Sequence, residues 1–514
     1  MSRLYKEVVQ AKNSLEVPIF ASGKAAHSKY APQREAENFA PEKNGEIFFA
    51  VVLGAAGGFH LQSLLRRNPG CKILAIEKSQ EDLDFLKENV PLIKKLFEDK
   101  RIVFCAADQE GAAESALSQN YFPAHYGNLE ILTLRSWSQE AGQDFETIIK
   151  RIKALLPSIS ADYSTQARFG RLWSKNIFCN LRVLKKIQEK KQEAFCVSQS
   201  DLQKTAAVIA AGPSLDQTAD LIKQERNKYF VIATDTALKS FARRKIKVDA
   251  VVSIDAQFLS AEHFYACDCK GMIFVLDLGA DSSIANYALN NNGKLIFANS
   301  GHPLISFASA FCKNPFPRLQ SGGGTVAISA VDFALQCGFK NVKIFGADFG
   351  YSRGKAYAKG SYLDDLYQCK QSRIDSAESA WTRLMFRSQL KKNERSILQS
   401  PVLLRYQETM ESFLGDFKRN NFIYDIKNQG RKSESLFLKS HFDFTAFKSR
   451  LDSICRLLEN SEEFLPEESL ILPDMAYWRT QADRDSVFCG QNKIQIKDAK
   501  KLALKKILLY NAML

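Results

Sequence analysis

The sequence predicts an α/β protein whose central domain is a Rossmann-like parallel sheet. Short apolar runs rich in Val, Ile and Ala alternate with amphipathic helical segments along much of the chain. Several runs end in a glycine turn that leads into a helix, as in TAAVIAAGPSLDQTADLI at residues 205–222. Other runs end in an aspartate, at the sheet edge where α/β proteins place ligand-binding groups. These features together predict a site at the carboxyl edge of the sheet.

The 514 residues exceed one typical domain, and we expect four parts. They are a Rossmann-like N-terminal domain with a lead-in segment at 1–137, a helical bridge at 138–200, a central nucleotide-binding domain at 201–370 and a mainly helical C-terminal region at 371–514.

The N-terminal domain contains a first Rossmann-like unit. An apolar strand at Ile47–Leu53 runs into Gly54, Gly57 and Gly58, and the next strand ends at Glu77, near the position where such folds hold a ribose. This pattern fits either a site for a nucleoside such as adenosylmethionine or a scaffold that has the fold without the ligand. The scaffold is the favoured interpretation.

Two helical segments carry polar groups that allow more than one interpretation. In the bridge, Asn176 and Asn180 lie one turn apart, which fits a polar site or a solvated edge, and we favour the edge. The last segment, KIQIKDAKKLALKKILLYNAML, is basic and amphipathic, which fits a membrane surface, a partner or docking on the protein's own core. Docking on the core is the favoured interpretation.

The composition restricts the functional class. The net charge of +14 attracts polyanions in general, but no zinc-finger spacing or aromatic RNA-binding signature is present, so nucleic acid is not an expected partner. Of the 11 cysteines, Cys267 and Cys269 lie close together but lack a second pair at metal-ligand spacing, so no metal site is expected there. Without an apolar run of transmembrane length or a secretory signal, we expect a cytoplasmic protein with reduced thiols and no membrane span.

Two glycine turns of the central domain are candidates for binding an anion. The backbone N–H groups at a helix start are unpaired and the helix dipole is positive there, so each turn can hold a phosphate or carboxylate. A single turn of this kind is commonly a plain connection, and two in one domain favour nucleotide binding. The candidate residues are Gly212, Pro213 and Ser214 in the first turn, and Ser321, Gly322, Gly323 and Thr325 in the second.

Carboxylates end three strands of the same domain. They are Asp235, Asp255 and Asp348, and Gln257 follows the second of them. Carboxylates gathered at one edge of a parallel sheet can bind ribose hydroxyls or a magnesium ion.

A glycine-punctuated loop with Tyr351, Tyr357 and Lys359 follows Asp348. It suits a lid over a phosphate leaving group, because phenols donate hydrogen bonds and cations offset negative charge. The alternative is a basic surface loop whose tyrosines are packed.

The order of these segments resembles the Maf (motility-associated factor) and MptE-like family. The resemblance rests on GPSL, TDTA, IKVDAVVSIDAQ, SGGGTVAISAVDFALQCGFKNVKIFGADF and the tyrosine loop, with HSKYAPQREAENF and GAAGGFHL nearer the N-terminus. It covers most of the chain and is weakest past residue 430. The central domain is also similar to bacterial lipooligosaccharide sialyltransferases, which implies a sialyltransferase-like sheet that holds a CMP-sugar without a required metal.

The resemblance carries over to particular residues. Gly212–Ser214 and Ser321–Gly322 match the sialyltransferase turns, and Tyr351 and Tyr357 have the six-residue spacing of two tyrosines that assist departure of the phosphate. Ala211 and Asp235 stand where those enzymes have asparagines, which changes the nucleotide contacts. Their histidine base lies downstream of the tyrosines, whereas here no histidine lies between His302 and His441, so the general base is unassigned.

The resemblance implies transfer of a nonulosonic, sialic-acid-like sugar from a CMP donor to Ser or Thr of a protein, with flagellin as the expected acceptor. Asp235 would contact the ribose or base, the tyrosines would stabilise the departing phosphate, and no cofactor would be required. The MptE-like branch implies instead a hydroxymethylpterin diphosphokinase that uses ATP, with magnesium held by Asp235, Asp255 and Asp348. A third possibility is a nucleotide-sugar binder or assembly factor without catalysis.

Overall fold

The computed structural model forms two compact units. Unit 1 comprises Met1–Gly170 and Leu457–Lys505, and unit 2 comprises Arg171–Arg456 and Lys506–Leu514. The structure describes residues 3–39, 47–190, 197–321, 324–393, 397–420, 423–428, 430, 441–461, 463–489 and 496–514. Nine cysteines of the described residues are free thiols, and none of the helices among these residues has both the length and the apolar character needed to cross a membrane.

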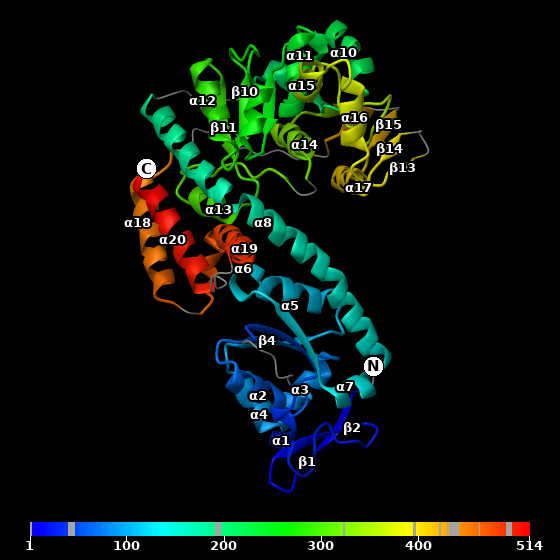
Figure 1. Cartoon of the computed structure of the whole chain (residues 1–514), viewed down its shortest axis with the longest axis vertical. Helices are drawn as coiled ribbons and strands as arrows, with labels where there is room; N and C mark the ends of the chain where they lie inside the picture. The colour runs from blue at the N-terminus through cyan, green and yellow to red at the C-terminus, as the bar shows by residue number, and fades with distance from the viewer. Residues whose placement is uncertain are drawn as a thin grey trace. The chain divides into compact units, whose positions relative to one another are not determined.

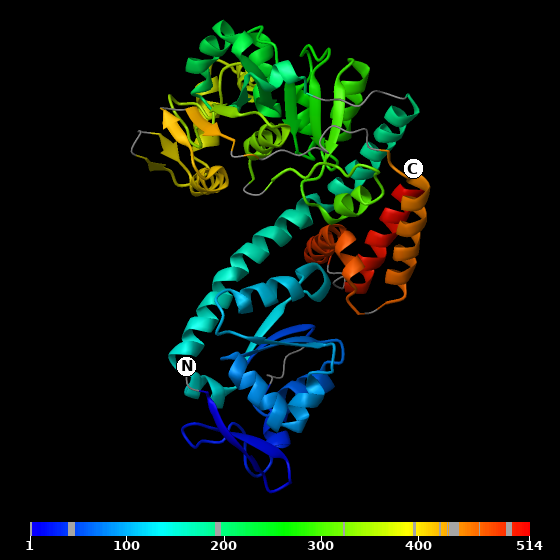
Figure 2. The same cartoon turned by 180° about the vertical axis from the view of Figure 1, so that it is seen from behind.

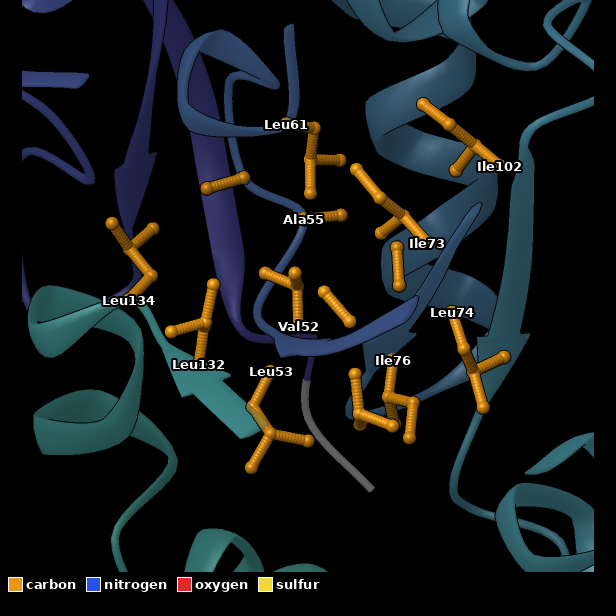
Figure 3. Packing of buried hydrophobic residues seen from close by; sticks show 14 of the residues in the cluster. Val52, Leu53, Ala55, Leu61, Ile73, Leu74, Ile76, Ile102, Leu132 and Leu134 are labelled. Carbon is orange, nitrogen blue, oxygen red and sulfur yellow. The ribbon is translucent and has the colours of Figure 1, made fainter. Parts of the chain in front are cut away.

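Unit 1 is built on a four-stranded parallel sheet in the order β5-β4-β3-β6. The strands are β3 (Phe49–Leu53), β4 (Lys72–Glu77), β5 (Ile102–Ala106) and β6 (Leu129–Thr133). Helices α2 (Phe59–Arg67), α3 (Gln80–Asn89) and α4 (Pro91–Leu96) cover one face, and α5 (Ala112–Asn120) covers the other (Figure 1). β3 is buried along its whole length because both faces of the sheet are covered. Val52, Ile73 and Leu132 belong to the buried hydrophobic core of this unit (Figure 3).

The N-terminal lead-in segment forms more structure than its polar composition indicates. β1 (Tyr5–Gln10) and β2 (Glu16–Phe20) form an antiparallel hairpin, followed by the short helix α1 (Pro32–Glu37). The remaining short helices of this part are α6 (Pro123–Tyr126) and α7 (Arg135–Ala141). The hairpin and β6 were not predicted, because β1 is largely polar and β6 is only half-buried.

Unit 2 is built on an eight-stranded sheet in the order β11-β10-β9-β8-β7-β12-β16-β15. Six strands are parallel: β7 (Thr205–Ile209), β8 (Tyr229–Thr234), β9 (Ala250–Ser253), β10 (Ile273–Asp277), β11 (Lys294–Ala298) and β12 (Asn341–Phe345). The helices are α10 (Leu215–Gln224), α11 (Asp235–Arg243), α12 (Ser282–Asn290), α13 (Pro303–Ser309) and α14 (Val326–Cys337), with one-turn elements α9 (Gln199–Leu202), η1 (Arg226–Lys228) and η2 (Phe258–His263).

The strand order of unit 2 reverses at β7. From β7 the chain moves through β8 to β11 in one direction, and it then returns through α14 to β12 on the other side of β7. Right-handed crossovers therefore place α10, α11 and α12 on one face and α14 on the opposite face, where α14 packs against β7, β8, β9 and β12. Loops that leave β7 and β12 flank a topological switch point, the usual binding crevice of open α/β sheets.

The region after residue 370 combines helices with short strands that complete the central sheet. β16 (Ile423–Lys427) pairs antiparallel with β12, with Ile344 opposite Tyr424, and β15 (Lys418–Asn420) adds the edge. α17 (Pro401–Leu414) lies beside these strands (Figure 2), where its Glu411 accepts hydrogen bonds from Arg419 and Tyr424. The other elements here are α15 (Tyr362–Lys370), α16 (Ala377–Met385), β13 (Lys391–Lys392) and β14 (Leu398–Gln399).

The two units also cut across the four predicted parts. One continuous helix, α8 (Gln143–Glu189), contributes its first half to unit 1 and its second half to unit 2. Residues 457–505 return to unit 1, where Lys500 donates to Glu468 at 2.7 Å and Glu468 also pairs with His125. The tail elements are α18 (Phe444–Glu459), η3 (Pro466–Leu470), α19 (Leu472–Cys489) and α20 (Ile496–Ala512). Ala499, Ala503 and Leu504 of α20 are buried, as docking on the protein's own core requires.

Asn176 and Asn180 do not lie on a solvated edge. Both are buried, and the Asn176 amide donates to the carbonyls of Ala256 and Gly279 at 2.9 and 3.2 Å. The Asn180 amide donates to the carbonyls of Leu278 and Ala280, each at 2.9 Å. The favoured interpretation was wrong because the helix packs against the loops after β9 and β10, whose carbonyls need donors.

Replacing Asn180 by Ala is expected to lower the free energy of unfolding by about 1–3 kcal/mol, because two buried carbonyls lose their donor. Urea unfolding of the full chain measures this loss. Arg182→Ala, an exposed change on the same helix, is the control and should shift stability by less than about 0.5 kcal/mol. A wild-type midpoint for Asn180→Ala would show that these bonds do not hold the loop.

Candidate functional site

The two loops at the switch point of unit 2 are hydrogen-bonded to each other. The N–H of Ala210 donates to Phe345 O and that of Gly212 donates to Gly346 O, both at 2.8 Å. Further along, the N–H of Ala358 donates to Ala211 O at 2.8 Å. The predicted glycine-proline-serine turn and the predicted tyrosine loop thus form one continuous surface at the carboxyl edge of the sheet.

Asp348 occupies the helix start at which the sequence predicts an anion. Its Oδ2 accepts from the backbone N–H of Ser214 at 3.0 Å and from the Ser214 hydroxyl at 2.9 Å. A Cβ on Gly212 would overlap this oxygen, so only glycine allows the approach, and Pro213 beside it is buried. Burial raises the pKa of Asp348, while the Ser214 bonds lower it. The anion at this helix start is therefore the protein's own carboxylate.

The tyrosine loop is anchored at both ends. Tyr351 exchanges backbone hydrogen bonds with Leu398 at 2.7 and 3.0 Å. At the other end, the N–H of Lys359 donates to Asp216 at 2.9 Å, and its carbonyl accepts from Ser240 and Arg244, each at 2.8 Å. The Lys359 side chain itself is exposed. The loop is thus held against α10 and α11 by its backbone.

Tyr351 and Tyr357 pack against the same small apolar cluster. This cluster contains Ala356, Trp381 and Met385, and the rings of Tyr357 and Trp381 lie 6.4 Å apart. Both tyrosines are half-buried, and burial is the main cause that raises the pKa of each hydroxyl. Both phenols therefore keep their protons near neutral pH and can donate hydrogen bonds. The tyrosines can therefore be packed against the protein and still donate hydrogen bonds to a leaving phosphate.

Asp235 lies below the surface at the end of β8. Its side chain is buried, with Oδ2 accepting from the Ser253 hydroxyl at 2.6 Å and Oδ1 accepting from the N–H of Thr236 at 2.7 Å. Burial raises its pKa. Because both oxygens are engaged by protein groups, this arrangement does not favour the direct ribose contact that the resemblance implies, and that contact stays a prediction.

Asp255 and Gln257 line the loop after β9 and are half-buried. The Asp255 carboxylate accepts from the N–H of Gln257 at 3.0 Å. This turn leads into η2, which ends at His263.

His263 is a candidate that sequence reasoning missed. Its ring lies edge-on to that of Tyr362, with centroids 5.5 Å apart, and its Nδ1 is buried without a hydrogen-bond partner in the described structure. Burial lowers the pKa of His263, and the nearby Asp235 carboxylate raises it. The family resemblance directs attention to a histidine downstream of the tyrosines, whereas His263 lies upstream of them, in the connection after β9. Only its position in the connection that follows the strand ending at Ser253 could have suggested it.

The second predicted turn is partly described. The Ser321 hydroxyl donates to Ser300 O at 2.7 Å, and Thr325 caps α14 by accepting from the N–H of Ala327. Gly322 and Gly323 lie outside the described residues. Gly324 has φ of +72°, and a Cβ there would meet the ring of Tyr406 at 2.7 Å. Tyr406 also raises the pKa of Tyr357, so this unpredicted tyrosine lies between the second turn and the tyrosine loop.

The three aspartates of the magnesium alternative do not form one set. Asp348 is bonded to Ser214, whereas Asp235 is bonded to Ser253 and Thr236 on another strand end. Across the described part of the chain, no group of three or more His, Cys, Asp or Glu side chains is arranged to hold a metal ion. The donor set that this alternative requires does not fit.

The glycine turn of unit 1 is filled by the protein's own side chains. Glu77 is fully buried and accepts from Trp137 Nε1, from the Ala55 N–H at 2.9 Å and from the Tyr5 hydroxyl at 3.2 Å. A Cβ on Gly54 would overlap the Trp137 side chain. The carboxylate near the ribose position is therefore satisfied internally, which is what the scaffold interpretation requires.

Buried histidines support the same turn. His27 accepts from the Gly57 N–H at 3.2 Å, and His60 lies 2.9 Å from Gly54 O, with the two rings 5.4 Å apart. Burial lowers the pKa of both histidines, that of His60 to about 4. Both are therefore neutral at pH 7.

A family model matches the central part of the chain, and a solved structure matches the fold of the whole chain. Residues 175–354 match the family model described as 6-hydroxymethylpterin diphosphokinase MptE-like. The structure of the MAf glycosyltransferase from Magnetospirillum magneticum AMB-1 matches 100% of this chain and 92% of its own, with a TM-score of 0.53 and 13% identity. The predicted α/β class is thereby confirmed, and the central part of the chain matches the MptE-like family model that the sequence resemblance predicts. At this identity, the structural match establishes the fold alone.

Three relatives come from Treponema pallidum (strain Nichols), and all three are uncharacterized proteins. One is 29% identical over 166 residues, which span 32% of this chain and 76% of the relative. The second is 40% identical over 106 residues, and the third is 24% identical over 229 residues. This chain spans 37% and 46% of the length of the second and third relatives.

The His60 site predicts a specific dependence of stability on pH. Because its pKa falls from 6.5 to about 4 on folding, the unfolded chain binds more protons between these values, and stability decreases as the pH falls from 6.5 to 4. The loss attributable to His60 is about 3 kcal/mol at pH 4. His60→Gln keeps a donor for Gly54 O and should flatten this decrease in urea titrations at successive pH values. An unchanged decrease in the variant would contradict the assignment.

Proposed function

Because residues 175–354 form an MptE-like domain in a chain with the Maf fold, we propose that this protein is a glycosyltransferase that uses a nucleotide-activated sugar. More specifically, it transfers a nonulosonic, sialic-acid-like sugar from a CMP donor to Ser or Thr of a protein acceptor, with flagellin as the expected acceptor. One observation carries the proposal. Two neutral tyrosines, Tyr351 and Tyr357, share one apolar cluster on a loop anchored at the switch point.

The geometry suits stabilisation of a leaving phosphate. Negative charge grows on the phosphate as its bond to the sugar breaks, and fixed donors stabilise that charge without reorganising. Tyr351 and Tyr357 supply protonated phenols, and the exposed Lys359 supplies a cation on the same loop. The backbone anchors at Leu398 and Asp216 hold the loop in position before the donor binds.

The two glycine turns take different roles in this proposal. Asp348 already fills the helix start at Ser214, so the first turn shapes the floor of the site through Gly212 and Pro213. The second turn, with Ser321 and Thr325 at its described ends, is left to hold the nucleotide phosphate or the sugar carboxylate. In this proposal, Asp255 and Gln257 of the turn after β9 contact the ribose or base.

No cofactor is required in this proposal, because the CMP-sugar is a substrate. The cytoplasm is the proposed location. The MptE-like description of the central domain favours one competing function, a hydroxymethylpterin diphosphokinase that uses ATP and magnesium. A binder or assembly factor without turnover is the remaining possibility.

Thermal-shift titration separates these functions. A ligand that binds only the folded protein stabilises it by about 2.7 kcal/mol at 100 times its Kd. We expect CMP to raise the Tm equally with and without magnesium, and ATP to have no effect. Stabilisation by ATP that needs magnesium, with no response to CMP, would support the kinase. A CMP response without any turnover of CMP-sugar would support the binder.

The tyrosine pair is tested by the double variant Tyr351→Phe with Tyr357→Phe. It should lower kcat for transfer from CMP-sugar by about 100-fold or more, because both donors to the leaving phosphate are lost. CMP binding and Tm should change little, since both rings keep their packing. Tyr367→Phe is the matched control, because Tyr367 stacks edge-on against the same Trp381 at 4.8 Å. Full activity in the double variant would overturn the leaving-group role.

A further inference from the structure

We propose that unit 1 binds a neutral carbohydrate in a cavity between α1, α2 and α4. The cavity has a volume of about 880 Å³, which is within the usual range of sites that hold small molecules. All the described residues that line it lie between positions 33 and 101, so it belongs to unit 1 alone. The inference goes beyond the transfer reaction proposed for unit 2 and stands without it, because it uses no residue of that unit.

The cavity is separate from the glycine turn of unit 1. Its walls are α1, one side of α2 and the end of α4, together with the connections that lead into β4 and β5 (Figure 1). These connections reach the amino edge of the sheet, whereas the glycine turn at 54–58 follows the carboxyl end of β3. None of residues 54–58 is among the described residues that line the cavity. The space is therefore not the one that the protein's own side chains fill at that turn.

One wall carries a buried hydroxyl. Ser63 of α2 lines the cavity and is 7% exposed, and its Oγ has no hydrogen-bond partner among the described residues. A serine inside a helix can bond to a carbonyl one turn back, but Ser63 does not make this bond. Because a buried hydroxyl without a partner costs free energy, a partner from outside the chain is favoured. A second hydroxyl matches it, since a hydroxyl both donates and accepts.

The other uncharged groups of the lining suit the same kind of ligand. Gln33 of α1 and Gln62 of α2 supply side-chain amides, which donate and accept hydrogen bonds without a formal charge. Phe59, Leu65 and Leu96 add a small apolar floor. A sugar ring combines hydroxyl groups around its edge with an apolar C–H face, so it matches both kinds of surface.

The charges of the lining cancel. Three cations and three carboxylates line the cavity, namely Arg66, Lys95, Arg101, Glu37, Glu98 and Asp99. The Arg66 guanidinium lies 2.9 Å from Glu37 Oε1. Arg101 donates to the Asp99 carboxylate twice, at 2.9 and 2.5 Å. A cavity without net charge does not concentrate polyanions or cations, which favours a neutral ligand.

Two other ligand classes fit less well. Leu65 and Leu96 belong to the last turns of α2 and α4, where the helix dipole is negative and a phosphate is disfavoured. A nucleobase needs an aromatic face on which to stack. Phe59 is the aromatic side chain of the described lining, and it is only 3% exposed. A neutral sugar requires neither a positive helix end nor an exposed ring.

The test uses the full chain with glucose, galactose and N-acetylglucosamine as probes, each titrated by saturation-transfer difference NMR. We expect at least one of them to bind with a Kd on the order of 1 mM, because its hydroxyls exchange water for protein partners at a small net gain. The affinity should not change with ionic strength, since the ligand carries no charge. Absence of binding by all three sugars would overturn this proposal. The transfer reaction would be unaffected, because the CMP titration tests it separately.

Two serine variants separate binding from stability. Ser63→Ala should weaken sugar binding by about 3-fold to 10-fold and keep the wild-type Tm, because its hydroxyl makes no bond that folding would lose. Ser79→Ala is the matched control, since the Ser79 hydroxyl caps α3 by accepting from the Asp82 N–H at 3.1 Å. It should lower the Tm and leave the sugar affinity unchanged. Wild-type affinity in Ser63→Ala would overturn the site.

Two further variants test the location. Gln62→Trp should abolish sugar binding by filling the cavity, whereas Lys94→Trp, on the exposed residue next to the lining residue Lys95, should leave it unchanged. Undiminished binding in Gln62→Trp would place the sugar elsewhere and overturn the proposal.

An acidic sugar tests the ligand class. N-acetylneuraminic acid should bind more weakly than the best neutral sugar. Tighter binding of this acid that is lost in Lys95→Gln and at high salt would overturn the neutral class, because only an anion depends on that cation.

Discussion

The contact between Asp348 and Ser214 is the constraint on which the site of unit 2 depends. It joins the ends of β7 and β12, the two strands on either side of the point where the strand order reverses. The carboxylate satisfies a helix start that would otherwise attract a foreign anion. It also requires glycine at position 212, because any larger residue would overlap Asp348. The tyrosine loop begins three residues after this carboxylate, so the same contact sets where that loop starts.

The carboxyl edges of the two Rossmann-like sheets differ in how far the protein's own side chains fill them. In unit 1, Trp137, Tyr5 and His27 fill the space near the glycine turn, and Glu77 receives protein donors only. In unit 2, one helix start is closed by Asp348, whereas His263, the tyrosines and the second turn remain partly exposed around the edge. The same fold therefore provides a structural support in one unit and a candidate site in the other, and side chains from loops make the difference.

Packing and chemistry are combined in the tyrosine loop. Tyr357 contacts the apolar cluster around Trp381 and is at the same time near Asp235 and Tyr406. Half-burial keeps the phenols protonated and limits their rotamers, and backbone bonds to Leu398 and Asp216 hold the chain on both sides. A loop held in this way needs little rearrangement of its backbone to bind an anionic leaving group.

The sequence by itself determined the α/β class, the apolar strands of both sheets and the glycine turns, because these depend on local patterns of apolar, glycine and helix-capping residues. It also identified the tyrosine loop and the strand-end aspartates, since residues at strand ends are close in sequence to the strands that place them. Only the tertiary structure decided that Asp348 closes the first helix start, that Asn176 and Asn180 hold buried carbonyls, and that residues 457–505 return to unit 1. The close approach of Tyr406 to Gly324 was decided there as well. Each of these depends on residues that are far apart in the sequence, such as Ser214 and Asp348, and sequence spacing carries no information about contacts that form only when separate strands and helices pack together.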